Sequence, residues 1–103
     1  MRRDLDLLRD LLLGLERAQR SPPEPIFVTL GDVARMFGRL PSEIEAHLDL
    51  LVRLDFIEGP GAYKDGLWLF RKLTKRGCWL VDNIRDARRW GEIKGTYAWV
   101  TNR

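Results

Sequence analysis

His47 is the first candidate for a chemical role in this 103-residue chain, because its imidazole could bind a metal ion or transfer a proton. It is the one histidine, and Cys78 is the one cysteine. A metal site at His47 would need an unusual set of carboxylates from Glu43 and Glu45. We therefore expect a structural or surface imidazole, a free thiol, and no metal ion or other cofactor.

The sequence lacks the motifs that support common enzyme chemistry. It contains no glycine-rich phosphate loop, no paired catalytic carboxylates that would face a cleft, and no serine nucleophile elbow. We predict that the protein is not an enzyme and has no catalytic residue.

Acidic residues dominate residues 42–58, where five acids and one arginine give a net charge of −4. A helix in this segment would occupy the place of a DNA-reading helix, where several carboxylates would repel phosphates. Part of this charge has a structural explanation, since carboxylates in the first turn offset the positive end of a helix. The alternative is a surface for a basic protein partner, formed by Glu43, Glu45, Asp49 and Arg53.

Basic residues gather further along the chain, and residues 71–94 carry a net charge of +5. Lysines and arginines in such a segment are typical contacts for nucleic-acid phosphates. A solvated helix face, with Asp82 paired to Arg85 and Asp86 paired to Arg89, explains the same charges equally well. The predicted nucleic-acid-binding residues are Lys64, Arg71, Lys72, Lys75, Arg76, Arg85 and Arg89.

The four tryptophans are expected to pack rather than to stack on nucleic-acid bases. Trp79 and Trp90 project within about 20° of each other at helical periodicity and should flank a core stripe. Trp68 alternates with inward-facing leucines of a strand, and Trp99 lies in a C-terminal tail. An oligomer interface is the alternative use of these rings.

The first element expected is an amphipathic helix over residues 5–15, of which seven are leucine. Its apolar arc is wider than one packing partner needs. The arc predicts either a helix wedged between two others, which we favour, or the surface of a homodimer. The stretch "SPPEP" at residues 21–25 should end this helix, because prolines remove amide donors and restrict the residues before them.

Two short helices joined by a tight turn are expected next, after an extended run over residues 26–28, and they predict a helix-turn-helix. Thr29 should cap the first of them together with Asp32. Gly38 is a natural left-handed stop, and Ser42 with Glu45 should form a second capping box. The second helix is expected to bury Ile44, Leu48, Leu51 and Val52.

The segment between Phe56 and Lys72 predicts a two-stranded hairpin, or wing. It joins the turn-rich stretch "EGPGAYKDG" to the strand-like run "LWLFRKL". Thr74 should then cap one long final helix. The inward-facing residues of that helix are expected to be Gly77, Leu80, Ile84 and Ala87. Gly91 and Gly95 weaken its far end, and "TYAWVT" has the character of a strand or a docked tail.

These elements predict a mostly helical winged helix-turn-helix domain over residues 1–94 and a tail over residues 95–103. The chain is long enough for one modest core. Its formal net charge of +3 permits a polyanionic partner without requiring one. The lone cysteine and the absence of a signal sequence favour a cytoplasmic protein, and the longest apolar run is too short for a membrane span.

Three blocks resemble a family of small bacterial and prophage proteins, family 2513 of the domains of unknown function. The blocks are "MRRDLDLLRDLLLGLE", "IEAHLDLLVRLDFIEG" and "LTKRGCWLVDNIRDARRWGEIK". The resemblance implies a winged-helix-like fold and frequent residence on mobile elements, and it supplies no catalytic residue. The chain departs from the family pattern by inserting "FVTLGDVARMFGRLPSE". The residues that fall on family positions are His47, Thr74, Gly77, Ile84, Arg85, Asp86 and Trp90.

Two functions from different classes fit these observations. A small transcriptional regulator of bacterial or prophage origin would bind double-stranded DNA through the basic residues, with steep salt dependence. A protein-interaction module of a mobile element would instead bind or inhibit a host nucleic-acid machine through the acidic helix. We rank the regulator first because winged helices often bind DNA, although a fold alone does not fix a function.

Overall fold

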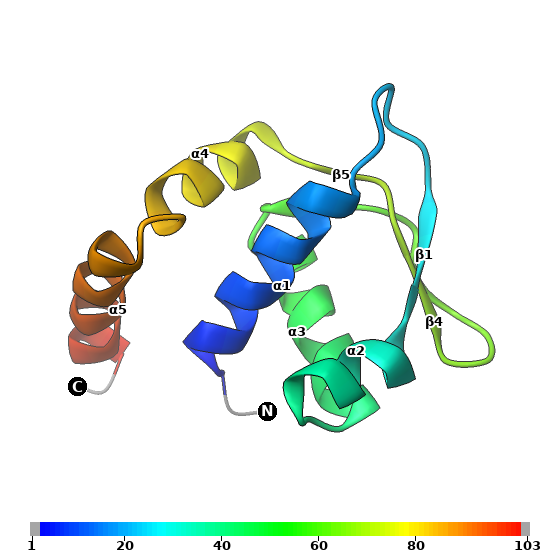
Figure 1. Ribbon diagram of the computed structural model, residues 1–103, viewed down its shortest axis with the longest axis horizontal. Coiled ribbons are helices and arrows are strands. Elements are labelled where there is room, and N and C mark those ends of the chain that lie inside the picture. The colour runs from blue at the N-terminus through cyan, green and yellow to red at the C-terminus, as the bar shows by residue number, and fades with distance from the viewer. Residues whose placement is uncertain (1–2, 102–103) are drawn as a thin grey trace.

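The computed structural model describes the backbone of residues 3–101 and the side chains of residues 3–96. Its helices are α1 (Leu5–Ala18), α2 (Leu30–Phe37), α3 (Pro41–Arg53), α4 (Lys75–Ile84) and α5 (Ala87–Thr101). Its strands are β1 (Ile26–Thr29), β2 (Ile57–Glu58), β3 (Gly61–Tyr63), β4 (Leu67–Phe70) and β5 (Lys72–Leu73). The predicted class, mostly helical with a small β-hairpin, is confirmed (Figure 1).

The strands form two small antiparallel sheets, one in the order β1-β4-β3 and one that pairs β2 with β5. Strands β3 and β4 make the predicted hairpin. Asp65 and Gly66 in its turn have φ angles of 61° and 74°, and short hairpin turns need such left-handed residues. Strand β1 pairs with β4 from Ile26 opposite Phe70 to Thr29 opposite Leu67. The chain after the proline-rich stretch is therefore tied to the hairpin.

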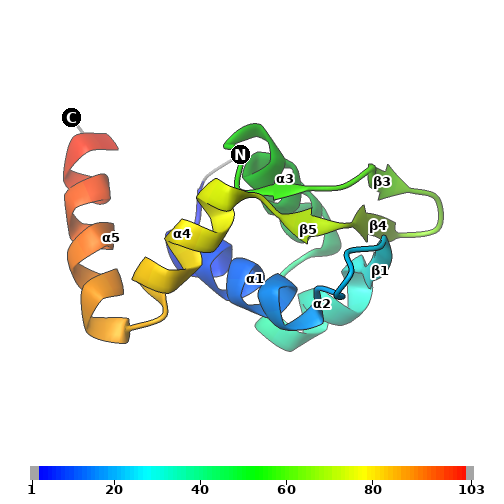
Figure 2. The ribbon, with the colours of Figure 1, turned by 90° about the horizontal axis from the view of Figure 1, so that it is seen from above.

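Helix α1 lies at the centre of the fold, with α4 and α5 on one side and α2 and α3 on the other (Figures 1 and 2). Its N-terminus is capped by Asp4, whose carboxylate accepts the Leu7 N–H at 3.1 Å. It packs against α3, α4 and β5. The favoured interpretation, a helix wedged between others, is confirmed. The residues that α1 buries are Leu7, Leu11, Leu12 and Leu15.

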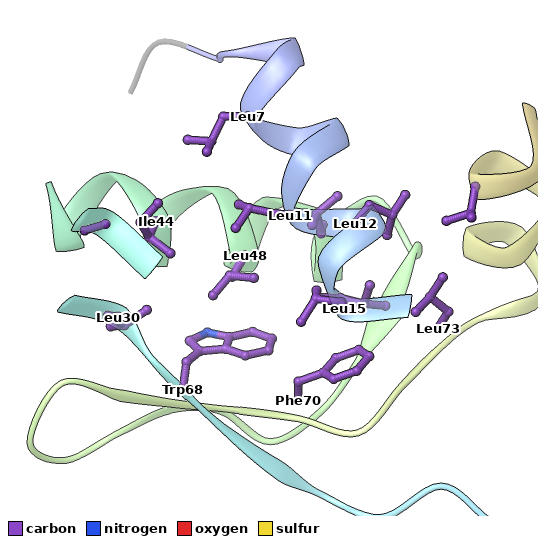
Figure 3. Close-up of a cluster of buried hydrophobic side chains, with 14 of the residues drawn as sticks. Leu7, Leu11, Leu12, Leu15, Leu30, Ile44, Leu48, Trp68, Phe70 and Leu73 are labelled. Atoms are coloured by element: carbon purple, nitrogen blue, oxygen red, sulfur yellow. The ribbon is translucent and has the colours of Figure 1, made fainter. Parts of the chain in front are cut away.

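The core forms where β4 faces α1 and α3. Trp68 and Phe70 are both 0% exposed, and Figure 3 shows their rings beneath Leu11, Leu15 and Leu48. Alternation along the strand sends the side chains of Trp68 and Phe70 to the same face. Burial of one large apolar side chain contributes roughly 1.5–3 kcal/mol, so these two rings fix the hairpin against the helices. The predicted burial of Trp68 is confirmed.

The turn between α2 and α3 has the predicted left-handed stop, because Gly38 has a φ of 65°. The two predicted caps are wrong in detail. Thr29 occupies the cap position of α2 without a side-chain hydrogen bond, and Asp32 pairs with Arg35 instead. Helix α3 begins at Pro41, before the predicted Ser42 cap, because the fixed φ of proline suits the first helical position.

The C-terminal part contains two helices, so the prediction of one long helix is wrong. Thr74 caps α4 as predicted, and its hydroxyl accepts the Gly77 N–H at 3.0 Å. The helix then breaks, because the Asp86 carboxylate accepts the backbone N–H groups of Arg88 and Arg89 at 2.8 and 3.1 Å and so caps α5. Ala87, predicted to face inward, is exposed at the first residue of α5.

The backbone of residues 95–101 continues α5, so of the two alternatives for this segment, a strand or a docked tail, the strand is wrong. The glycines at 91 and 95 lie within this helix and do not end it. Residues 102–103 of the predicted tail lie outside the described residues. Val52 of α3 was also predicted to be buried, but its side chain is 37% exposed. The helix turns by about 100° per residue, so the position after the buried Leu50 and Leu51 faces solvent.

Candidate nucleic-acid interface

The seven predicted nucleic-acid-binding residues do not form one surface. Lys64 lies in the turn between β3 and β4, at one end of the longest axis, whereas α5, which contains Arg89, lies at the other end (Figures 1 and 2). The molecule extends 37 Å along this axis. The basic residues of the wing tip and of α5 therefore face different surroundings.

The start of α4 docks on residues 55–56, directly after α3, and a smaller set of cations lies on the elements that meet there. The Thr74 N–H donates to the Phe56 carbonyl at 3.1 Å, and the Thr74 hydroxyl donates to the Asp55 carbonyl at 2.6 Å. Gly77 permits this approach, since a Cβ there would lie 1.9 Å from the Phe56 oxygen. We define the α3/α4 junction by Arg53, Lys72, Lys75 and Arg76.

Most cations of the α3/α4 junction have no acidic partner among the described side chains. Lys72 lies 3.9 Å from Glu58, which also accepts a hydrogen bond from Arg71 at 2.8 Å. The Arg76 guanidinium lies over the Phe56 ring, 4.9 Å from its centroid. Within residues 3–96, no ion pair involves Arg53, Lys75 or Arg76. Their charges are therefore free to meet an external anion.

The first turn of α4 carries Lys75 and Arg76 and no acidic residue. The N-terminus of a helix bears a partial positive charge, so cations there are unfavourable for the helix itself. At this end the N–H groups of Thr74 and Gly77 are already hydrogen-bonded. The N–H groups of Lys75 and Arg76 remain, and first-turn N–H groups without a partner are a natural place for a phosphate. A bound phosphate would relieve the repulsion and accept hydrogen bonds from the backbone and both side chains.

Arg85 and Arg89 have different surroundings from the junction. Two nitrogens of Arg85 donate to the Glu16 carboxylate at 2.9 and 2.7 Å, which raises the pKa of Arg85 and joins α4 to α1. The predicted pair with Asp82 also forms, at 3.6 Å. Arg89 is exposed, and Asp86 accepts its backbone N–H instead of pairing with its side chain. Arg85 therefore has a structural role, whereas Arg89 remains available.

Two of the three α3 carboxylates proposed for a partner surface have structural partners. Glu43 accepts the Leu40 N–H at 3.2 Å and lies 3.5 Å from Arg39. Asp49 accepts the indole N–H of the buried Trp68 at 3.0 Å. Glu45 makes no hydrogen bond or ion pair within the described side chains. The acidic charge of α3 is therefore partly explained by folding.

A polar cluster that sequence analysis missed joins the start of α1 to α3. The Asp4 N–H donates to His47 Nε2 at 3.1 Å. Because Nε2 accepts, Nδ1 carries the proton and donates to the Glu43 carbonyl at 2.7 Å. Asp4 also pairs with Arg39. Burial opposes ionisation of Asp4, but the Leu7 N–H and Arg39 hold its pKa below the usual value. His47 is 1% exposed, which confirms a structural imidazole.

The remaining tryptophans and the cysteine have different environments. Trp90 is half-buried, and its indole N–H donates to Asp6 at 2.9 Å. Trp79 is 66% exposed, so its predicted place beside the core is wrong. The buried positions of α4 are Gly77, Val81 and Ile84, and a residue midway between Gly77 and Val81 points outward. Cys78 is exposed, as its position on the polar side predicted, and the Trp99 side chain lies outside the described residues.

A model of the family described as "Hypothetical protein (DUF2513)" matches residues 2–100. The chain belongs to DUF2513. The resemblance of the three sequence blocks is thus confirmed, and the DUF2513 match extends over nearly the whole chain. No curated protein and no solved structure matched.

Between residues 3 and 101, no helix has the length and apolar character to cross a membrane. Among the side chains of residues 3–96, His, Cys, Asp and Glu form no group of three or more that could hold a metal ion.

Proposed function

We propose that this DUF2513 protein is a winged-helix transcriptional regulator that binds double-stranded DNA through the α3/α4 junction. The order α1, β1, α2, α3 and hairpin supports a winged helix, as does the placement of β1 beside the second hairpin strand. In this arrangement α2 and α3 are the helix-turn-helix pair, and the β3–β4 hairpin is the wing.

The observation that carries this proposal is the pair of cations in the first turn of α4. Lys75 and Arg76 oppose the helix dipole and have no acidic partner in the described chain. Cations at a helix N-terminus lower the stability of the free protein, and they favour the binding of a polyanion at that end. Phosphate contacts of this kind position a protein on DNA without reading bases. Lys64 at the wing tip and Arg89 on α5 would add further backbone contacts.

The direct test is the salt dependence of DNA binding. Removal of one phosphate-binding side chain should reduce the slope of log affinity against log salt by about 0.9. We expect the double variant Lys75→Ala/Arg76→Ala to bind more weakly, with a slope smaller by about 1.8 because two such side chains are removed. The double variant Arg17→Ala/Arg35→Ala removes the same formal charge from other helices and should keep the slope. Equal slopes for the two double variants would contradict the proposal.

A second candidate is a protein-interaction module of a mobile element that binds a basic partner through α3. Met36 and Leu40 favour it, because they are 74% and 64% exposed beside the start of the acidic helix, and exposed apolar groups mark protein contacts. The variant Glu45→Lys separates the candidates, since Glu45 is the α3 carboxylate without a partner among the described side chains. Loss of a basic partner with unchanged DNA binding would favour the second candidate.

Pairing of two chains through α1 also remains a proposal. Leu5 and Leu8 are only partly buried on α1, and they leave apolar surface that a second copy could cover. Light scattering over a range of concentrations tests this pairing, and a monomer at the highest concentration would exclude it.

A further inference from the structure

An apolar cavity lies between α1, α4 and α5, beside the end of α3. Its volume is 140 Å³, and it opens to solvent on one side. None of the four residues that define the α3/α4 junction lines it, so it is a separate feature. The apolar side chains that line it include Leu8, Leu12, Leu54, Phe56, Leu80 and Trp90.

Arg9 and Lys94 are the two charged residues among those that line this cavity, and the lining itself is almost wholly apolar. Arg9 donates to the carbonyls of Ile84 and Arg85 at 2.8 and 3.2 Å and caps the end of α4. It makes no ion pair with any described carboxylate. Lys94 instead donates to Asp6 at 3.0 Å. One positive charge beside an apolar space is therefore left without an anion in the described part of the chain.

We propose that this cavity binds a small monocarboxylate with an apolar body, whose carboxylate meets Arg9. An apolar cavity of roughly 150 Å³ takes up a benzene-sized guest and stays dry without one. The volume here suits a body of that size, such as the five-carbon chain of hexanoate. A guanidinium presents several N–H donors in a planar fork that fits a carboxylate. Arg9 uses Nε and Nη2 on carbonyls, which leaves Nη1 as a donor.

A bound guest would touch both the body of the domain and α5. Trp90 and Ile93 of α5 line the cavity together with Leu8 of α1 and Leu80 of α4. The guest would therefore add contacts between α5 and the rest of the fold. The indole N–H of Trp90 donates to Asp6 next to the cavity, so its NMR resonance is a local reporter.

The test titrates hexanoate into the full chain and follows the Trp90 indole cross-peak, with 1-hexanol as the uncharged probe. We expect a saturable shift with hexanoate. Hexanol should bind about fivefold more weakly, which is the factor in affinity that one partly exposed ion pair contributes. Arg9→Gln should remove this preference, and Arg9→Lys should retain it. The absence of a saturable shift, or equal affinity for the two probes in the wild type, would overturn the proposal.

Two phenylalanine variants separate the cavity from general effects on α1. Leu8→Phe fills the space and should abolish the hexanoate shift, whereas Leu13→Phe enlarges a leucine of the same helix that does not line the cavity and should preserve it. Thermal melts establish that both variants fold. Equal loss in both variants would overturn the proposal. So would sedimentation data showing a dimer that excludes hexanoate, because a second copy would then be the occupant.

Discussion

Helices α3 and α4 begin with charges of opposite sign, and only one set suits the helix that carries it. Glu43 lies in the first turn of α3, where it favours the helix dipole and accepts the Leu40 N–H. Lys75 and Arg76 lie in the first turn of α4, where the dipole repels them. Glu43 thus stabilises its helix, whereas Lys75 and Arg76 destabilise the helix that carries them.

This difference gives a criterion for separating structural charge from functional charge. Asp49 and Glu43 explain why an acidic helix is compatible with the proposed DNA-binding function, because Trp68 and Arg39 already interact with their carboxylates. Lys75 and Arg76 of α4 have no acidic partner within the described residues, although Arg76 lies over the Phe56 ring. Charge that local electrostatics disfavours is therefore the better guide to a binding surface in this protein.

The largest expected effect comes from separating the two helices at Gly77. In Gly77→Ala, the new Cβ would lie 1.9 Å from the Phe56 oxygen and 2.9 Å from its carbonyl carbon. The backbone must shift, and we expect a loss of about 3 kcal/mol or more in the free energy of unfolding, measured with urea. Gly14→Ala is the matched control, because its Cβ meets nothing within 4 Å. It should stabilise the protein by about 0.5–1 kcal/mol.

The second effect tests whether the α3 carboxylates serve the fold. Asp49→Ala leaves the indole N–H of Trp68 buried without an acceptor. We expect a loss of about 1–3 kcal/mol in unfolding free energy, measured by urea denaturation. Glu45→Ala, from the same helix, should change stability by less than about 0.5 kcal/mol. Similar values for the two variants would mean that the comparison of structural and free carboxylates is wrong.

The third effect tests the opposite expectation at the start of α4. Lys75→Glu replaces a cation that the helix dipole disfavours with an anion that it favours. We expect unfolding free energy to rise by about 0.3–1 kcal/mol, while affinity for DNA falls. Lys64→Glu at the wing tip is the control for stability alone, since no helix begins there; its unfolding free energy should not rise, although its affinity for DNA should also fall. A loss of stability in Lys75→Glu would show that Lys75 has a structural partner.

Local patterns predicted most of the elements, whereas contacts between distant residues determined the site. The Thr74 cap, the Gly38 stop and the burial of Trp68 follow from short-range rules that involve neighbouring residues. The bond from Trp68 to Asp49 spans 19 positions in the sequence. Periodicity cannot anticipate such a contact. The sequence therefore showed that Asp49 adds negative charge to the helix, but not that its carboxylate accepts a hydrogen bond from Trp68.

The break before α5 shows a different limit of sequence analysis. The apolar stripe of α4 continues in register toward Ala87, so periodicity alone favours one long helix. The competing signal is Asp86, whose carboxylate captures the N–H groups of Arg88 and Arg89. Asp strongly favours helix caps over helix interiors. The spacing of apolar residues stays helical across Asp86, however, so that spacing does not reveal where one helix ends and the next begins.

The smallest expected effect concerns Asp6, another carboxylate with structural partners. The Trp90 indole N–H and, after it, Lys94 hold the pKa of Asp6 below its ordinary value of 3.8. These interactions stabilise the docking of α5 in full above that value. The stabilisation disappears as the pH falls through the lower pKa of the folded state, because protonation removes the charge.

Acid titration of the Trp90 indole cross-peak checks this prediction, since Asp6 is its acceptor. We expect the wild type to show a transition below pH 3.8 and Asp6→Asn to lack it, because asparagine does not titrate. Glu45→Gln removes a carboxylate without a structural partner among the described side chains and should leave the wild-type profile unchanged. If Asp6→Asn retained the transition, another group would hold α5, and Asp6 would join Glu45 among the carboxylates that folding does not explain.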